Sequence, residues 1–140
     1  MLRKQDKETS ALADELAALE VFRTLDRKAV DALAGSGRVV HLPTQWALVT
    51  ESQPADSCYV LLSGQTEVRQ HGDVVATLGA GALVGEAALV EHKTRNATVV
   101  TLGEVRALRL GFDDLSTLFA QHPAVEQVFR AEWDKRSAGV

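Results

Sequence analysis

The hydrophobic positions of the chain divide it into helical ends and a central region of β type. In residues 10–20, leucines recur at helical spacing with acidic residues between them, which predicts an amphipathic helix. A second helix is predicted over residues 26–34, with Asp26 as its N-cap and Gly35 as its stop. The largely polar residues 1–9 are expected to form an N-terminal tail ahead of these helices.

The central region, residues 38–110, consists of short runs rich in β-branched residues that are separated by turn residues. Strands are expected at 38–42, 47–50, 58–62, 65–71, 74–78, 97–102 and 105–110. Tight hairpin turns are expected at His71-Gly72-Asp73, Ser63-Gly64 and Leu102-Gly103-Glu104. This spacing of short strands favours a β-sandwich or a β-barrel.

The helical pattern returns after Gly111, and C-terminal helices are expected within residues 112–136, with Asp113 as a candidate N-cap. Pro123 suits the first position of the last helix, where the N–H that it lacks is not needed. An apolar stripe runs along that helix and comprises Val125, Val128, Phe129 and Trp133. The stripe must pack against something, and three partners are open: the barrel, a bound ligand or a second molecule.

Length, charge and composition narrow the class of protein. The 140 residues fit one domain, residues 10–140, that is long enough to bury a core. The formal net charge of −4 and the pI of about 5.5 argue against a broad nucleic-acid surface, which would need clustered Lys and Arg. No stretch is apolar enough to cross a bilayer or to act as a signal peptide, so a cytoplasmic location is expected. The excess of Arg over Lys points to a bacterial source.

Enzyme and metal chemistry find little support in the residues. Cys58 is the only cysteine, which excludes an internal disulfide and a cysteine-based zinc site. The histidines show no His-x-His or i, i+4 pairing, so no metal or other cofactor is expected. The chain contains no Gly-x-Ser-x-Gly elbow, no Cys–His arrangement and no Walker loop, and it is not expected to be an enzyme.

One stretch between two expected strands carries the candidate chemistry. Gly85 allows a tight turn, and the residues after it, which begin Glu86-Ala87-Ala88, can form one short helical turn. The free N–H groups at the start of such a turn attract an anion. Arg95 offers a planar fork for two phosphate oxygens, whereas Glu86, an acceptor only, suits a ligand hydroxyl. Together these features indicate a site for a small phosphate ester.

This stretch resembles the phosphate-binding cassette of cyclic nucleotide-binding domains, as in catabolite activator proteins and the regulatory subunits of cAMP-dependent protein kinase. The resemblance covers roughly residues 21–133. Its motifs are Phe22-x-x-Leu25, Pro54-Ala55-Asp56-x-x-Tyr59-x-Leu61-x-Ser63-Gly64, Leu78-Gly79-x-Gly81, Gly85-Glu86-x-Ala88-Leu89, Arg95-x-Ala97-Thr98 and Phe112-x-x-Leu115. It implies an α+β fold: a β-barrel or jelly roll (a double-stranded β-helix) with flanking N- and C-terminal helices and a short phosphate-binding helix.

The resemblance also implies which residues surround a cyclic nucleotide. These are Gly85, Glu86, Ala87, Ala88, Arg95, Asn96 and Ala97, with Val84, Thr98 and Trp133 as further candidates. Glu86 would accept the ribose 2′-hydroxyl, and Arg95 would pair the cyclic phosphate. The backbone N–H groups of Ala87, Ala88 and Asn96 would complete the cradle.

Several residues depart from the family pattern. Gln45 and Ser52 stand where the family usually has turn glycines, and Val84 stands where an aromatic residue commonly precedes Gly-Glu. At the position of Asn96, Thr is associated with cGMP preference, whereas Ala or Ser accompanies many cAMP binders. We therefore expect cAMP as the ligand and leave cGMP open. Trp133 is either an anchor for the final helix or a lid over the ligand base.

Three functions fit these features. The favoured one is a stand-alone cyclic-nucleotide sensor that signals through its C-terminal helices to an unknown protein effector, as a monomer or a homodimer. The alternative is a degenerate, ligand-free interaction or scaffold domain, in which Arg95 is a surface strand residue or forms a structural ion pair with Glu86. A transcription regulator is the least favoured, because the sequence stops where its helix-turn-helix would begin.

Overall fold

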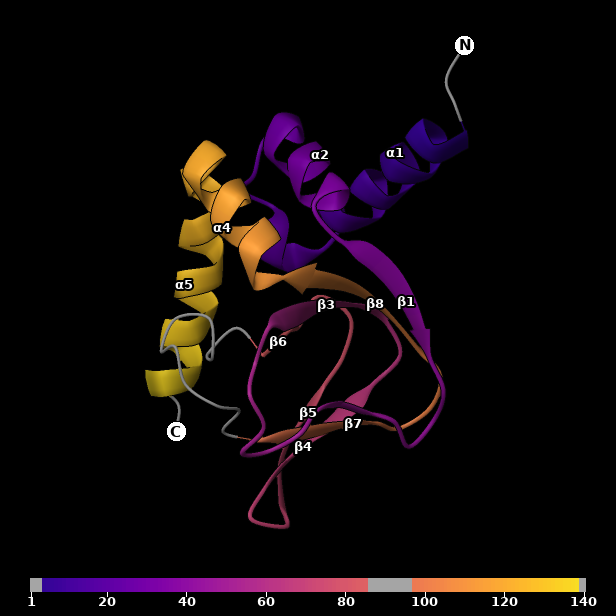
Figure 1. The fold of residues 1–140 in the computed structure, drawn as a ribbon, viewed down its shortest axis with the longest axis vertical. Coiled ribbons are helices and arrows are strands. Elements are labelled where there is room, and N and C mark those ends of the chain that lie inside the picture. Colours follow the sequence, from indigo (N-terminus) through magenta and orange to yellow (C-terminus); the bar gives the residue numbers. More distant parts are fainter. Residues whose placement is uncertain (1–3, 86–96, 139–140) are drawn as a thin grey trace.

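A computed structural model describes residues 4–85 and 97–138 of the chain (Figure 1). The strands are β1 (Arg38–Leu42), β2 (Ala47–Val49), β3 (Ser57–Ser63), β4 (Thr66–Gln70), β5 (Asp73–Leu78), β6 (Leu83–Val84), β7 (Thr98–Thr101) and β8 (Val105–Gly111). The helices are α1 (Lys4–Ala17), the 3₁₀ helix η1 (Glu20–Phe22), α2 (Arg27–Gly35), α4 (Phe112–Gln121) and α5 (Pro123–Ala138).

The strands form two four-stranded antiparallel sheets. One has the order β1-β8-β3-β6 and the other the order β2-β7-β4-β5. Figure 1 shows the helices gathered on the outer side of the first sheet, with the second sheet across the barrel from it. We call the first the helix-side sheet and the second the open sheet.

Two apolar clusters form the core, one on each face of the helix-side sheet. The cluster inside the barrel consists of Leu48, Val49, Leu61, Val84, Val99, Val105 and Ala107. The cluster under the helices includes Phe22, Leu33, Val60, Leu62, Leu108, Leu115 and Phe129. This jelly-roll-like antiparallel barrel with flanking helices confirms the fold class that the sequence predicts; the predicted short phosphate-binding helix lies outside the described residues.

Strand β3 lies between these two clusters. Successive side chains of a strand point to opposite faces. Val60 and Leu62 accordingly belong to the cluster under the helices, whereas Leu61 belongs to the cluster inside the barrel. Because both faces are covered, the strand is a nearly continuous apolar run rather than an alternating one.

The N-terminal helix is longer than the sequence predicts. The sequence assigns residues 4–9 to a tail, but α1 begins at Lys4 and makes them helical. The Lys, Gln and Glu residues of this stretch carry little helix penalty, and no Pro or Gly interrupts it. The prediction relied on apolar periodicity, which begins only at Leu12.

The two predicted N-caps have different outcomes. Asp26 caps α2 as expected, since its side chain accepts a hydrogen bond from the backbone N–H of Ala29 at 2.9 Å. The prediction for Asp113 is wrong, because α4 starts one residue earlier with Gly111 as its N-cap. Asp113 lies in the first turn instead, where its negative charge favours the helix dipole.

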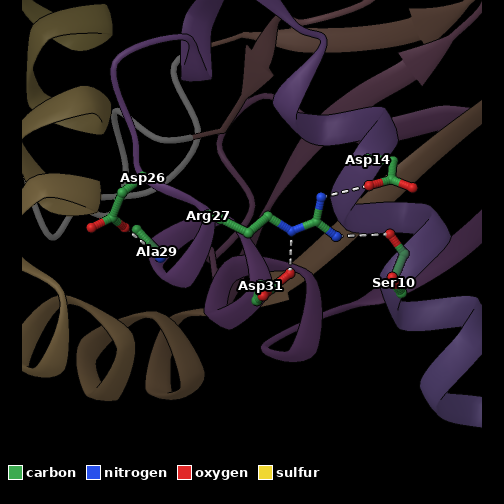
Figure 2. Close-up of polar contacts among 6 residues, drawn as sticks. All are labelled: Ser10, Asp14, Asp26, Arg27, Ala29 and Asp31. Atoms are coloured by element: carbon green, nitrogen blue, oxygen red, sulfur yellow. Dashed lines mark hydrogen bonds and ion pairs between the residues drawn. The ribbon is translucent and has the colours of Figure 1, made fainter. Parts of the chain in front are cut away.

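The Arg27 side chain links α2 to α1 through hydrogen bonds, as Figure 2 shows. Its Nε donates to Asp31 Oδ1 at 2.8 Å within α2, Nη1 donates to Asp14 of α1, and Nη2 donates to the carbonyl oxygen of Ser10 at 3.3 Å. These contacts raise the pKa of Arg27, the hydrogen bond to Asp14 most and that to Asp31 next. The N-terminal helices therefore form one unit beside the barrel.

The three predicted hairpin turns also have different outcomes in the structure. His71 and Gly72 join the paired strands β4 and β5 with φ values of 52° and 85°, the signature of a tight hairpin turn. The other two predictions are wrong, because Ser63-Gly64 and Leu102-Gly103-Glu104 each connect one sheet to the other. These two connections run so close together that a Cβ on Gly64 would lie 2.5 Å from the carbonyl oxygen of Glu104.

Candidate functional site

The predicted cassette connects the two sheets. β6 ends in the helix-side sheet at Val84, and β7 begins in the open sheet at Thr98. Residues 86–96 lie outside the described residues, and with them the candidates Glu86, Ala87, Ala88, Arg95 and Asn96. The described residues define the two ends of the candidate site.

The first end is held by core packing. β6 pairs with β3, where Val84 lies opposite Tyr59, and Val84 is buried in the cluster inside the barrel. Gly85 follows with a φ of 87°, in the left-handed region that a residue with a Cβ seldom adopts. This φ is the freedom for which the sequence analysis chose Gly85, and the residues that would complete the predicted turn lie outside the described residues. Val84, which replaces the aromatic residue of the family pattern, fills the core at this point.

The second end is held by hydrogen bonds. Ala97 is buried, and Thr98 lies opposite Arg69 of β4. The Thr98 Oγ1 accepts a hydrogen bond from the backbone N–H of Glu51 at 2.9 Å. The Glu51 carboxylate accepts one in turn from the backbone N–H of His71 at 3.1 Å. Thr98 therefore fixes the β2–β3 loop and, through it, the tip of the β4–β5 hairpin.

The sequence analysis does not identify Glu51 as part of this arrangement. Glu51 lies in the loop after β2 and belongs to none of the motifs. Its contacts to Thr98 and His71 arise only when β2, β4 and β7 pair in the open sheet. No local periodicity could have indicated them.

The apolar stripe of α5 packs within this chain. Val125 and Phe129 are buried in the cluster under the helices. The Phe129 ring lies 5.4 Å from that of Phe119 and 6.5 Å from that of Phe22, measured between centroids. The stripe thus joins the helical cover of the barrel, the first of the three predicted partners. Trp133 lies one turn further along α5 and is partly buried.

The described part of the chain contains neither a metal-binding cluster nor a membrane-spanning helix. Within residues 4–85 and 97–138, no three His, Cys, Asp or Glu side chains gather closely enough to hold a metal ion. None of the helices in the same ranges combines the length and apolar character needed to span a membrane.

A closed pair of antiparallel sheets, with helices on one side and a candidate binding segment between strands of different sheets, defines a barrel-type ligand-binding module. The sequence profile of the cyclic nucleotide-binding domain matches residues 39–122. The chain belongs to this family.

Named relatives agree with the assignment. The CRP-like cAMP-activated global transcriptional regulator of Mycobacterium tuberculosis is 25% identical over 121 residues, which cover 82% of this chain and 54% of the regulator. The cAMP-dependent protein kinase regulatory subunit of Yarrowia lipolytica is 38% identical over 93 residues, covering 65% of this chain and 24% of that subunit. The chain therefore spans about half or less of these relatives.

A solved structure shares the fold. The regulatory domain of Toxoplasma gondii PKA, crystallised with cAMP, superposes with a TM-score of 0.83 at 18% identity, and the match covers 98% of this chain and 53% of that one. The similarity extends over the barrel and the flanking helices alike, because nearly the whole chain is matched.

Proposed function

We propose that this chain is a regulatory module that binds cAMP and passes the signal to a protein effector through its C-terminal helices. The observation that carries the proposal is the left-handed turn at Gly85, at the start of a cassette sequence in a member of this family. The relatives described above, whose names include cAMP, support the choice of ligand. In this proposal the module is not an enzyme and acts in the cytoplasm.

The described residues at the two ends of the segment are apolar, so in this proposal the segment itself supplies the charge. Val84, Ala97 and Val99 are all buried apolar residues at the two ends of the segment. A phosphate taken out of water requires hydrogen-bond donors or a cation. In the proposal, Arg95 and the N–H groups of Ala87, Ala88 and Asn96 fill that need, and Glu86 accepts the ribose hydroxyl.

Helix α5 is the proposed output. Its Phe129 contacts both Phe119 of α4 and Phe22 of η1, so a displacement of α5 would be felt throughout the helical layer. Trp133, further along the same helix, would respond to a ligand that binds between the sheets. A ligand shifts such an equilibrium only by its difference in affinity for the two positions of the helix.

Calorimetric titration with cAMP and with cGMP tests the proposal. Arg95→Ala should weaken cAMP binding by roughly 30-fold to several-thousand-fold, because it leaves the charge of a buried phosphate unpaired. Glu86→Ala should weaken it by roughly ten- to a hundred-fold, the effect of one charge-assisted hydrogen bond. Arg23→Ala, which removes an exposed arginine outside the cassette, is the matched control and should bind as the parent does.

The analogue 2′-deoxy-cAMP separates the two roles. The parent should bind it more weakly than cAMP, Glu86→Ala should lose most of this discrimination, and Arg95→Ala should keep it. Equal discrimination in the parent and in Glu86→Ala would remove the ribose role from Glu86. If neither nucleotide produces heat or raises the melting temperature of the parent, the ligand-free scaffold replaces the sensor.

A further inference from the structure

A polar groove lies where α2 passes into β1 and where β8 passes into α4. Its volume is about 780 Å³, within the usual range for binding sites. The side chains that matter for its chemistry are Arg38, Arg109, Asp114, Thr117 and Gln121. Gly35, at the end of α2, and the loop of Ser36 and Gly37 lie along its edge.

The groove is separate from the cassette. It is built on β1 and β8, whereas the cassette follows β6, and β1 and β6 are the opposite edges of the helix-side sheet. Neighbouring strands lie about 4.8 Å apart, so the two edges are about 14 Å from each other. A ligand in the groove would not compete with one held at Gly85.

Two arginines and one carboxylate, Asp114, line the groove, which leaves it with a net positive charge. Arg38 and Arg109 are register partners on β1 and β8, and like charges placed opposite each other in a sheet are destabilising. Arg109 lies 3.6 Å from Asp56, whose side chain is 88% exposed, so this pair is weak. Among the described residues no carboxylate forms an ion pair with Arg38. The arrangement favours an outside anion.

The walls of the groove are fixed by close contacts. A Cβ on Gly37 would lie 2.5 Å from the carbonyl oxygen of Arg109, so the loop rests directly on β8. The Ser36 hydroxyl donates to the carbonyl oxygen of Ala32 at 2.7 Å and ties the same loop to α2. The two arginines therefore project from a rigid base.

A free anion is a poor match for this groove. Both guanidiniums reach solvent, and one exposed ion pair contributes little to binding. A ligand gains affinity here only by making several contacts along the groove. Asp114, Thr117 and Gln121 follow one another along α4 over about 10 Å, the length of about three extended residues. Asp114 accepts hydrogen bonds, which a peptide N–H can donate.

We propose that this groove binds an acidic peptide segment of a partner protein, with its carboxylates on Arg38 and Arg109 and its backbone along α4. The inference rests on the proposed function only in identifying that partner as the effector of the sensor. Since α4 continues directly into α5, the peptide contacts the same helical layer that the ligand is proposed to move.

Amide NMR titration of the full chain with a peptide of alternating Glu and Gly tests the inference. The amide resonances of Gly37 and Gly111 should shift saturably, and added salt should weaken the binding. Arg38→Gln should weaken it about fivefold, and Arg38→Gln combined with Arg109→Gln should weaken it about 25-fold. Arg23→Gln, an equal change of charge at an exposed arginine outside the groove, should leave it unchanged.

Three results would overturn the inference. A peptide of alternating Gln and Gly could produce the same shifts, Arg23→Gln could weaken binding as much as Arg38→Gln, or inorganic phosphate could match the Glu peptide at equal concentration. The last result would reassign the groove to free oxyanions. Titration with cAMP separates this inference from the proposed function. The parent and the Arg38→Gln variant should bind cAMP equally. If the parent binds the peptide but no cyclic nucleotide, the sensor proposal is refuted and the proposal of a peptide-binding groove stands.

Discussion

The two sheets of the barrel are similarly apolar in sequence but differ in what covers them. β3 of the helix-side sheet is buried along most of its length, between the cluster under the helices and the cluster inside the barrel. β5 of the open sheet also contains consecutive valines, yet Val74 is 57% and Val75 is 53% exposed. Apolar content therefore predicts a strand, whereas the helices that pack on a sheet decide whether its outer face is buried.

The same difference affects the candidate site, which lies between the sheets. On the helix-side sheet, Val84 is held by core packing. On the open sheet, Val99 is also buried in the cluster inside the barrel, but Thr98 is fixed by one hydrogen bond to the β2–β3 loop, near the exposed hairpin tip at His71. Regions with few buried apolar contacts open at lower free energy than core strands. We expect the end of the cassette on the open sheet to respond more readily to a ligand.

The largest contrast is predicted for two glycines with left-handed backbone. Gly64 has a φ of 91°, and a Cβ there would lie 2.5 Å from the carbonyl oxygen of Glu104. Gly72, at the tip of the open sheet, has a φ of 85° and nothing within 4 Å of the same position. Gly64→Ala should reduce the free energy of unfolding by about 3 kcal/mol or more, because strain and a backbone clash add. Gly72→Ala should cost about 1 kcal/mol from strain alone.

Urea denaturation of both variants measures this contrast. Equal losses would mean that the connections between the sheets can separate freely, contrary to the close contact at Gly64. A soluble but unfolded Gly64→Ala protein would agree with the expectation.

The second contrast uses one substitution in both sheets. Val60→Ala in β3 should cost about 2–3 kcal/mol, because it removes buried methyl groups and leaves a cavity. Val75→Ala in β5 should stay within about 0.5 kcal/mol of the parent, since the side chain is mostly in water. Thermal and urea unfolding both report the difference. A substantial loss with Val75→Ala would indicate that something covers the open sheet in solution.

The sequence predicts most strands but not how they pair. The strand at 38–42 is predicted with its observed bounds, since a glycine pair precedes it and Pro43 follows. β6 is missed because two residues give no periodicity. A Ser-Gly or Gly-Glu turn shows that the chain reverses but not which strand it meets, so Gly64 and Gly103 are predicted as hairpins although they cross between sheets.

The candidate site is predictable to a similar extent. The glycine at position 85 indicates that a left-handed backbone is allowed there, and the structure has it. The contact of Thr98 with Glu51 and the pairing of Arg38 with Arg109 do not, because sheet register brings distant segments together. Physical chemistry identifies local backbone needs from a sequence, whereas long-range neighbours depend on the whole topology.

A smaller effect is expected at the hydrogen-bonded end of the site. Thr98→Val keeps the shape of the side chain but leaves the Glu51 N–H without its acceptor, at a cost of about 1–2 kcal/mol. Thr77→Val, at an exposed position of β5, is the matched control and should be nearly neutral. Hydrogen exchange at the Glu51 amide should accelerate in Thr98→Val alone. Unchanged exchange there would show that the loop is held by other contacts.

The smallest effect is a gain in stability on the open-sheet side. Gln45 and Ser52 have φ values of 59° and 72°, and they lie in the connections on either side of β2, the edge strand of that sheet. A left-handed backbone strains the folded protein by about 1–2 kcal/mol when the residue has a Cβ. Glycine removes this strain, but it lowers the free energy of unfolding by about 0.4–1 kcal/mol because the unfolded chain gains conformational freedom. Gln45→Gly should therefore stabilise the protein by about 0.5 kcal/mol. It also keeps the backbone hydrogen bond from residue 45 to the Thr101 carbonyl oxygen, at 3.1 Å.

The neighbouring Thr44→Gly tests the cause of that gain. Thr44 is not among the described residues with positive φ, so glycine there adds unfolded-state freedom without relieving strain and should destabilise by about 0.5–1 kcal/mol. Opposite signs for the two variants, measured from urea midpoints, would place the strain at position 45. If Gln45→Gly also destabilises, the Gln45 side chain makes contacts that outweigh its backbone strain. The family's turn glycine would then have been replaced here without loss of stability.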